Sequence, residues 1–576
     1  MPRDKRVSIY PRRCSELWAE STRSGHIEIL TDARLLLGRY AINETAGLVW
    51  RLCDGKHDIK DIATSIAEAC DGRMPSRDII LRDVMDCLEE LRREGLVTWP
   101  DQKTVDVLLV IPPFPTTYAP YASQVPEYSS PPLGLAYIAA VLREHGYRVA
   151  IEDLHINSAM PEDILPVCRH LEPKIVGITA STPSYPNAER VARHIKAWNS
   201  DVITVIGGAH VTGLPIEPAS SGVFDFSVVG EGEFTMLELT DALLREKGDP
   251  RRVSGLVFFS SDGIRNSYFR QKKDGIKFLD LSKNDNLIYN PARTNLKNLD
   301  RFPRPARDLL DIQAYFQKGA IISTRGCPID CNFCACSAIF GHTYRMHSVG
   351  YVLDEVEELI RKYNIRHFDF HDDTFNLINK RVFKFCDEII NRKLDFKWSC
   401  FCRAAQFNPE MANTMARAGC GVIQFGVESG NNHIIKTIKK RTSLKQIEEA
   451  VKGAAAAGIE QIACGFIVGH AQDTPETIQE TIDFALHLKK IGATRLTLSV
   501  LTPYPGTEVF ERANELGIRF LTTDWEQYIF SRVVIETEHL DKHTLRELYV
   551  GGLIKFLEAV EQPYSNFQRQ MIKAAI

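Results

Sequence analysis

The sequence has no long apolar run and no large excess of charge of one sign. No stretch of about 18 consecutive apolar residues occurs, which argues against a membrane-spanning helix. The formal net charge of the 576-residue chain is −4, so no global positive field attracts nucleic acid or acidic lipid. Residues 1–13 are polar and basic, without the apolar core of a secretion signal. These absences predict a soluble, cytoplasmic protein with neither a membrane nor a nucleic acid as partner.

A disulfide framework is also lacking. Most of the 14 cysteines stand singly in apolar stretches, as Cys53 and Cys464 do, where a free thiol packs as a small hydrophobic group. Only residues 327–336 contain a cluster of cysteines. This pattern favours a reducing compartment and one metal site over a secreted, disulfide-rich fold.

The first half of the chain changes pattern twice. Residues 1–100 are expected to form a small winged-helix-like domain, with an amphipathic helix over 76–94 followed by a short strand. Residues 101–250 alternate apolar runs with helical patterns, which predicts an α/β domain with a doubly wound parallel sheet. Its strands are expected at 105–111, 147–151, 174–179, 202–206 and 225–229. Residues 251–312 are polar and rich in turns, as in a connector.

A second series of strands and helices follows in residues 313–520. Strands are expected at 320–324, 366–370, 396–401, 422–427, 461–468 and 495–501. Six such units predict a partial (β/α)6 barrel, in which chemistry gathers at the carboxyl ends of the strands. Residues 521–576 are expected to form a C-terminal helical extension.

The cysteine cluster directly follows the first strand of this series. Cys327, Cys331 and Cys334 have the spacing C-x3-C-x2-C. Three thiolates at this spacing can bind three irons of a [4Fe–4S] cluster and leave the fourth iron open. Structural zinc is the alternative, with Cys336 as a fourth ligand, but zinc requires four closed ligands and the C-x-C step fits that geometry poorly. The spacing therefore favours the open iron–sulfur cluster.

Residues 316–515 resemble the radical S-adenosylmethionine (SAM) superfamily. The resemblance implies that SAM chelates the open iron and is cleaved to a 5′-deoxyadenosyl radical. It also implies SAM contacts at three later strand ends, which carry FDFHDDTF, FGVESG and GFIVG; the residues concerned are Asp372, Asp373, Glu428, Ser429, Gly465 and Ile467. Arg403 follows the third strand, from which a guanidinium can reach the SAM carboxylate.

Each of these positions also has a purely structural interpretation. Asp372 and Asp373 could cap a helix, and Gly465 and Gly469 could serve only close packing. The chain also departs from the family pattern at Gln472, where that pattern usually has Glu.

In the preceding domain, glycine and hydroxyl residues collect at the strand ends, where a parallel sheet binds its ligand. No G-x-G-x-x-G follows Val110, which disfavours a nicotinamide or flavin site. Residues 105–245 resemble the cobalamin-binding domain, and its pairing with a radical SAM domain is typical of the cobalamin-dependent radical SAM family. We expect the cofactor contacts at Thr179, Ser181, Gly207, Gly208, Gly230 and Glu231.

Some cobalamin-binding domains supply a histidine to cobalt from a D-x-H-x-x-G loop after the first strand. Here that loop, residues 112–132, contains no histidine. Asp153-Leu154-His155 follows the second strand instead, and Ser158 stands in place of the glycine. We therefore expect the lower face of cobalt to be free of a protein histidine.

Residues 27–99 resemble the small PqqD-like peptide-recognition domain. The resemblance is carried by residues 40–50, 53–55, 61–63 and 91–97, and it implies that the leader of a precursor peptide binds as an added strand. A winged helix on DNA is disfavoured, because residues 27–99 hold 14 Asp and Glu against 10 Lys and Arg. A packing domain without a partner is the other alternative.

Together these resemblances imply a radical SAM enzyme, a C-methyltransferase. The expected reaction methylates an unactivated carbon of a ribosomally synthesised precursor peptide with two SAM molecules, one as the methyl donor and one as the radical source. Flavodoxin or ferredoxin is the expected electron donor. The alternatives are methylation or cyclisation of a small-molecule natural product, and a non-catalytic cobalamin or redox sensor.

Overall fold

The computed structural model divides into two compact units, each described by itself. One unit comprises residues 1–108, 160–176 and 190–203, and the other comprises 109–159, 177–189 and 204–576. The chain is described in full over residues 104–114, 129–157, 159–245, 247–259 and 286–559, and elsewhere only at short strands and single helical positions. Over these described residues, no helix is both long enough and apolar enough to span a bilayer.

The N-terminal residues form an antiparallel three-stranded sheet in the order β2-β3-β4. Its strands are β2 (Leu17–Ser21), β3 (Ile27–Thr31) and β4 (Tyr40–Ile42). A separate antiparallel pair joins β1 (Arg12–Arg13) to β5 (Val97–Thr98). Of the predicted helix 76–94, the described positions 84, 87, 88 and 91 are helical, and Val84, Leu88 and Leu91 are buried.

The middle of the chain forms a seven-stranded sheet in the order β14-β11-β10-β9-β8-β6-β7. Its strands are β6 (Val107–Ile111), β7 (Val149–Asp153), β8 (Ile175–Thr179), β9 (Ile203–Gly207), β10 (Phe226–Val228), β11 (Leu256–Phe259) and β14 (Leu287–Tyr289). The first five lie within two residues of the predicted strands. The division between the two units cuts β6, β8 and β9, and the carboxyl ends of these strands belong to the second unit.

The segment expected as a connector contributes strands to this sheet. β10 pairs in parallel with β9, whereas β11 is antiparallel to β10 and β14 is antiparallel to β11. All four residues of β11, Leu256–Phe259, are buried, so this short apolar run extends the sheet. Residues 269–272 and 275–278 form a hairpin of β12 and β13.

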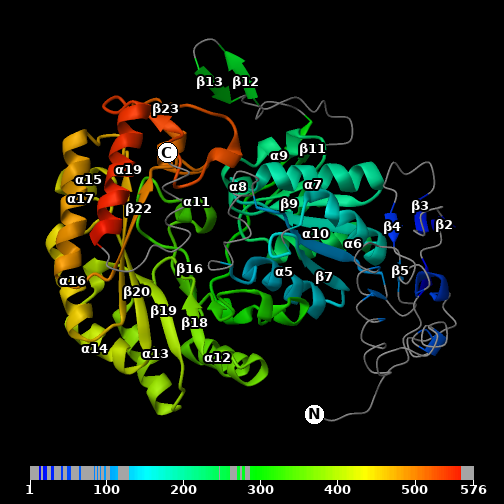
Figure 1. The fold of residues 1–576 in the computed structure, drawn as a ribbon, viewed down its shortest axis with the longest axis horizontal. Helices are drawn as coiled ribbons and strands as arrows, with labels where there is room; N and C mark the ends of the chain where they lie inside the picture. The colour runs from blue at the N-terminus through cyan, green and yellow to red at the C-terminus, as the bar shows by residue number, and fades with distance from the viewer. Residues whose placement is uncertain are drawn as a thin grey trace. The chain divides into compact units, whose positions relative to one another are not determined.

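Helices of this α/β domain are α5 (Leu133–Glu144), α6 (Ile164–Leu171), α7 (Tyr185–Trp198), α8 (Ala209–Gly213), α9 (Ile216–Ser220) and α10 (Glu233–Leu244). α5 and α10, both in the second unit, pack against each other (Figure 1).

The second unit also contains a six-stranded sheet in the order β15-β18-β19-β20-β21-β22, with every neighbouring pair parallel. The strands are β15 (Ala320–Ile321), β18 (His367–Phe370), β19 (Lys397–Cys402), β20 (Cys420–Glu428), β21 (Gln461–Val468) and β22 (Arg495–Val500). The helices between them are α12 (Val349–Tyr363), α13 (Asn379–Asn391), α14 (Pro409–Arg417), α15 (Asn432–Thr437), α16 (Leu444–Ala456) and α17 (Pro475–Lys490). This arrangement confirms the predicted partial barrel.

Polar residues start several of these helices. Ser348, Asn408, Ser443 and Thr474 each accept a hydrogen bond from the backbone N–H three residues later, at α12, α14, α16 and α17. Such caps satisfy N–H groups that have no partner within the first turn. One continuous apolar core then joins the helices to the strands.

The C-terminal helix α19 (Lys542–Ala559) packs against α17 and the edge strand β22, and Figure 1 shows α17 and α19 side by side. The approach is close, because a Cβ at Gly552 would lie 2.7 Å from the Leu498 side chain. Before it, β23 (Arg519–Phe520) and β24 (Ile535–Glu536) form a short antiparallel pair.

Candidate functional site

The three clustered cysteines lie in one loop after β15. Sγ of Cys327 is 3.7 Å from Oγ1 of Thr374, and Sγ of Cys331 is 3.9 Å from the carbonyl oxygen of Lys439. The N–H of Cys334 donates to the carbonyl of Cys331 at 3.1 Å. Burial raises the pKa of the Cys331 and Cys334 thiols, the latter to about 11.

Within the part of the chain that the structure describes, no three Cys, His, Asp or Glu side chains are grouped to hold a single metal ion. A [4Fe–4S] cube binds each thiolate to a different iron, so its sulfurs need not converge on one point. Thiolate is the ligand that iron–sulfur clusters use, and the donor set of this loop suits one.

Gly326 fixes the start of the cysteine loop. Its φ is +87°, and a Cβ there would lie 2.3 Å from the carbonyl oxygen of Thr343, so only glycine fits. Its N–H donates to the Asp373 carboxylate at 2.9 Å. Asp373, predicted as a cofactor residue, therefore holds the backbone next to Cys327.

Asp372 holds the chain a few residues earlier. Its buried carboxylate accepts from the N–H and hydroxyl of Ser323, at 2.7 and 2.5 Å, and from the N–H of Thr324 at 2.8 Å. Arg381 also donates to the Ser323 hydroxyl, at 3.0 Å. Asp372 thus stabilises the strand that leads into the cysteine loop.

A buried cation lies beside Cys331. Lys440 donates to Oε1 of Glu428 at 2.5 Å. Burial alone would lower the pKa of Lys440, but Glu428 and Cys331 together raise it, so the amine stays charged. Arg403 donates to the carbonyl oxygens of Lys440 and Arg441, at 2.9 and 3.1 Å, and so fixes the segment that carries this cation.

The remaining predicted SAM residues lie on β20, on β21 and in the turns that follow these strands. Ser429 is fully buried and its hydroxyl is 3.1 Å from that of Thr481. Gly469, at the end of the G-x-I-x-G segment, has a φ of +86°, and its N–H donates to Asp473 at 2.9 Å. Asp473, which directly follows Gln472, was not predicted as a site residue. Its buried carboxylate orders this turn.

A cavity of about 1,250 Å³ opens among the barrel strands. Five of the seven predicted SAM residues line it, namely Asp372, Asp373, Glu428, Gly465 and Ile467, whereas Arg403 and Ser429 do not. Four of its lining phenylalanines are 39–61% exposed, so much of its wall is open aromatic surface: Phe114, Phe316, Phe401 and Phe530. The cavity can hold a nucleoside next to the cysteine loop and still leave room for an apolar substrate.

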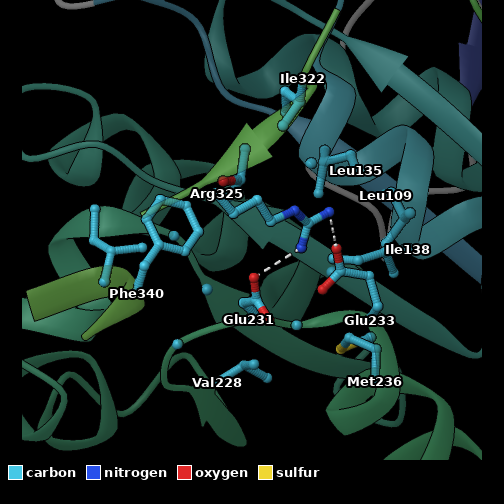
Figure 2. A pocket seen from close by; sticks show the side chains of 18 of the residues that line it. Leu109, Leu135, Ile138, Val228, Glu231, Glu233, Met236, Ile322, Arg325 and Phe340 are labelled. Atoms are coloured by element: carbon cyan, nitrogen blue, oxygen red, sulfur yellow. Dashed lines mark hydrogen bonds and ion pairs between the residues drawn. The ribbon is translucent and has the colours of Figure 1, made fainter. Parts of the chain in front are cut away.

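A second cavity, of about 260 Å³, lies at the carboxyl ends of β8, β9 and β10 (Figure 2). Five of the six predicted cobalamin residues line it: Thr179, Gly207, Gly208, Gly230 and Glu231. Ser181 does not, and its hydroxyl is 2.9 Å from that of Ser184. The labelled apolar side chains around this cavity include Leu109, Leu135, Ile138, Val228 and Met236.

Glycine is required at one wall of this cavity. Gly208 has a φ of +105°, and a Cβ there would lie 2.5 Å from the Ala180 carbonyl oxygen. Glycines and apolar side chains suit a flat, largely apolar group that must approach the backbone closely, so the residues present fit part of a cobalamin.

The carboxylate of Glu231, at the edge of this cavity, forms ion pairs with two arginines. It accepts from Arg325 at 3.0 Å and from both terminal nitrogens of Arg345 at 2.8 and 2.9 Å. Burial would raise the pKa of Glu231, but the two guanidinium groups lower it. Neither arginine was predicted as a partner of Glu231, because both lie about 100 residues away in the sequence, in the barrel segment.

His371 and Asp373 line both cavities. Burial lowers the pKa of His371, so its imidazole is neutral near pH 7. These two residues belong to a wall that the two cavities share.

His155 lies on the barrel cavity and does not line the smaller one. The His155 ring centroid is 4.9 Å from that of Phe114, and the backbone N–H of His155 donates to the Asp153 carboxylate at 3.0 Å. Tyr315 also donates to Asp153, at 2.8 Å. That the lower face of cobalt lacks a histidine therefore stays a prediction.

Three family models match the chain. The radical SAM superfamily matches residues 321–485, the B12 binding domain matches 123–240, and coenzyme PQQ synthesis protein D matches 22–97.

Several known proteins are similar in sequence to this chain over most of its length. An uncharacterized methyltransferase, PH0819, of Pyrococcus horikoshii is 32% identical over 79% of this chain and 93% of its own. The anaerobic magnesium-protoporphyrin IX monomethyl ester cyclase of Rubrivivax gelatinosus is 27% identical over 74% and 73%. The cytidylyl-2-hydroxyethylphosphonate methyltransferase of Streptomyces wedmorensis is 26% identical over 67% and 78%.

Two solved structures share the fold. The radical SAM methyltransferase TsrM of Kitasatospora setae, with cobalamin and a [4Fe–4S] cluster bound, has a TM-score of 0.58 at 17% identity, over 80% of this chain and 89% of its own. The cobalamin-dependent SAM radical enzyme OxsB, with aqua-cobalamin and SAM bound, has a TM-score of 0.62 at 16% identity, over 99% and 80%.

Proposed function

This chain belongs to the cobalamin-dependent radical SAM family, and from that premise we propose that it methylates an unactivated carbon of a ribosomally synthesised precursor peptide. The observation that carries the proposal is that the two cavities lie next to each other and share His371 and Asp373 as wall residues. A substrate carbon held there lies within reach of both cofactor sites.

In this proposal Cys327, Cys331 and Cys334 hold the cluster, and the barrel cavity holds SAM beside it. Asp373, Glu428, Gly465 and Ile467 line that cavity and are the residues we assign to SAM. The bound cofactors supply a radical that removes hydrogen from carbon and a methyl group carried by cobalamin, so each turnover consumes two SAM molecules.

The chain's own residues position these groups. Asp372 and Asp373 hold the backbone that enters the cysteine loop, and Lys440 offsets negative charge near Cys331. The glycines of the smaller cavity admit cobalamin against the backbone.

The PqqD match over residues 22–97 supports a peptide substrate. Within the described residues, β2 and β4 are the outer strands of the N-terminal sheet, and an edge strand can accept a peptide by backbone pairing. Proline on the paired edge removes a donor from that ladder. Ala19→Pro in β2 or Ala41→Pro in β4 is therefore expected to abolish binding of a leader peptide to the full chain, measured by fluorescence anisotropy.

A small-molecule substrate is the second candidate, because the names of several relatives specify small molecules. Synthetic peptides made from short reading frames beside the gene distinguish the two. Methylation of such a peptide, lost when its leader is removed, supports the peptide substrate. Failure of every peptide both to bind and to be methylated contradicts it.

Electrons must reach the cluster from outside, and a flavodoxin or ferredoxin is the donor we propose. Cys331 lines a third cleft, of about 580 Å³, that also includes Lys439 and Glu508. This cleft gives a donor a short path to the cysteine loop.

The cofactor assignment is tested anaerobically. The protein is reconstituted with iron, sulfide and hydroxocobalamin, given SAM and a strong reductant, and assayed for 5′-deoxyadenosine and S-adenosylhomocysteine by mass spectrometry. Formation of both products, lost in Cys331→Ala, is the expected result. Absence of both from a fully loaded protein supplied with candidate peptides contradicts the proposed enzyme.

A matched pair of variants tests the cobalamin cavity. Gly134 lines it near the start of α5, and a Cβ there meets no atom within 4 Å, so Gly134→Leu is expected to fill the cavity without disturbing the fold. Gly350 has the same position in α12 and a similarly open Cβ site, and it does not line this cavity. Gly134→Leu should weaken cobalamin binding, measured by absorbance titration, whereas Gly350→Leu should not.

A further inference from the structure

A buried network of two arginines and two glutamates joins the smaller cavity to the cysteine loop. Arg325 donates to Glu231 at 3.0 Å and to Glu233 at 2.8 Å, as Figure 2 shows, and Arg345 shares Glu231. All four side chains are at most 8% exposed. In so dry a setting, moving one partner leaves a buried charge without compensation.

The network spans two parts of the site, and Arg325, with Ile322 and Thr324 before it, also lines the smaller cavity. Glu231 lies in the turn between β10 and α10, and Glu233 is the first residue of α10; both line the cobalamin cavity. Arg325 stands two residues before Cys327, and it is paired with Arg345 in the short β16–β17 ladder (Thr324–Arg325 and Arg345–Met346). A shift of the cavity wall is therefore transmitted to the start of the cysteine loop.

Aromatic side chains fix the arginine further. The Arg325 guanidinium lies 5.0 Å from the ring centroid of Tyr137 and 4.7 Å from that of Phe302. Tyr137 belongs to α5, which also supplies Leu135 and Ile138 to the cavity wall. The guanidinium is thus held by three elements around the cavity, and such stacking is specific to a planar group.

The charge balance argues against a phosphate site here. Two guanidinium groups face two carboxylates, so the network carries no spare positive charge for a nucleotide tail. We propose that Arg325 is a positioning residue that couples occupancy of the cobalamin cavity to the order of the cysteine loop. This inference rests on the proposed cofactors and adds a link between their two sites.

Hydrogen–deuterium exchange of the full chain, with and without hydroxocobalamin, tests the coupling. In the wild type, hydroxocobalamin is expected to slow exchange both in residues 228–236, at the cavity, and in residues 327–335, the part of the cysteine loop that does not line the cavity. In Arg325→Met the first effect is expected to remain, while the slowing in 327–335 falls about five-fold or more. Arg325→Lys keeps the charge without the planar fork and should lie between the two.

Arg293 provides a matched control. It forms a two-point contact with Glu238 on the same helix α10, but it does not reach the cysteine loop. Arg293→Met should retain both effects of hydroxocobalamin. If Arg325→Met fails to fold, Glu233→Gln replaces it, because this change removes only one of the two carboxylates.

Four outcomes would overturn the inference in distinguishable ways. Full slowing of 327–335 in Arg325→Met refutes the coupling. Slowing of 228–236 without slowing of 327–335 in the wild type refutes it too, while leaving the proposed cofactor in place. Loss of cobalamin affinity in Arg325→Met makes Arg325 a direct ligand. No slowing anywhere in the wild type contradicts the proposed cobalamin site itself.

Discussion

Replacing Asp372 by asparagine should destabilise the barrel measurably, because this carboxylate accepts three buried hydrogen bonds. Asparagine keeps one oxygen for the N–H groups of Ser323 and Thr324. Its NH2 group, however, replaces the oxygen that faces the Ser323 hydroxyl, and the negative charge near Arg381 is lost. One charge-assisted bond contributes about 1.5–3 kcal/mol, so Asp372→Asn should lower the free energy of unfolding by roughly 2–3 kcal/mol.

For a barrel of roughly 200 residues this loss corresponds to a decrease of about 5–10 °C in the thermal midpoint. Trp398, buried on β19 against Phe370 and Phe375, contributes to the intrinsic fluorescence of the chain's six tryptophans, whose thermal change is compared between each variant and the wild type. Asp372→Ala leaves both N–H groups without a partner and should cost more, about 3–6 kcal/mol. Iron bound per chain after reconstitution should fall in the same order.

The control is Asp369→Asn, the same change three residues earlier, on β18. Asp369 is only half-buried, and among the described hydrogen bonds its carboxylate accepts one, from the Ser399 hydroxyl at 2.6 Å. We expect a loss of about 1 kcal/mol or less there. Equal midpoints for Asp372→Asn and Asp369→Asn would refute the reasoning.

Three further predictions concern other buried groups. Gly208→Val should abolish hydroxocobalamin binding in an absorbance titration while leaving the iron content unchanged, because its Cβ would lie 2.5 Å from the Ala180 carbonyl oxygen; retained affinity would contradict this. Burial raises the pKa of Asp473 to about 6, so the stability from its proton is full below about pH 4 and is lost as pH rises through 6. Asp473→Asn should therefore show a smaller fall of the thermal midpoint between pH 5 and 8 than the wild type, and an equal fall would contradict it. Burial lowers the pKa of His347 to about 4, so the stability from its neutral ring is full above about pH 6.5 and is lost as pH falls through 4. His347→Phe should lose less thermal midpoint than the wild type between pH 7.5 and 5, and a parallel fall in both would refute this.

The strands and the cavity residues were predictable because local patterns determine them. Continuous apolar runs such as Val107 to Val110 and Ile462 to Cys464 are buried in parallel sheets, and glycines at strand ends mark close approach. Strand β11 was missed because Leu256–Phe259 is a four-residue run amid polar sequence, and its antiparallel pairing with β10 and β14 depends on the tertiary fold.

The parts that could not be predicted depend on contacts between distant segments. Nothing near Glu231 in the sequence indicates Arg325, and nothing near Asp372 indicates that Ser323 is its partner. Glu231 was expected to contact the cofactor, yet its acceptors are occupied by arginines. Residue type and strand end predict where a carboxylate lies, whereas the tertiary fold decides which donor it meets.

The helix α19 has a consequence for how this protein can diversify. Leu553, Phe556 and Leu557 project from it onto the barrel cavity, although it lies outside the six-stranded motif that carries the cysteine loop. The depth and shape of the barrel cavity therefore depend partly on α19, which lies outside the strands that carry the residues assigned to SAM. Substitutions in α19 therefore offer a way, in evolution or in engineering, to alter which molecules this cavity accepts while the residues assigned to SAM stay unchanged.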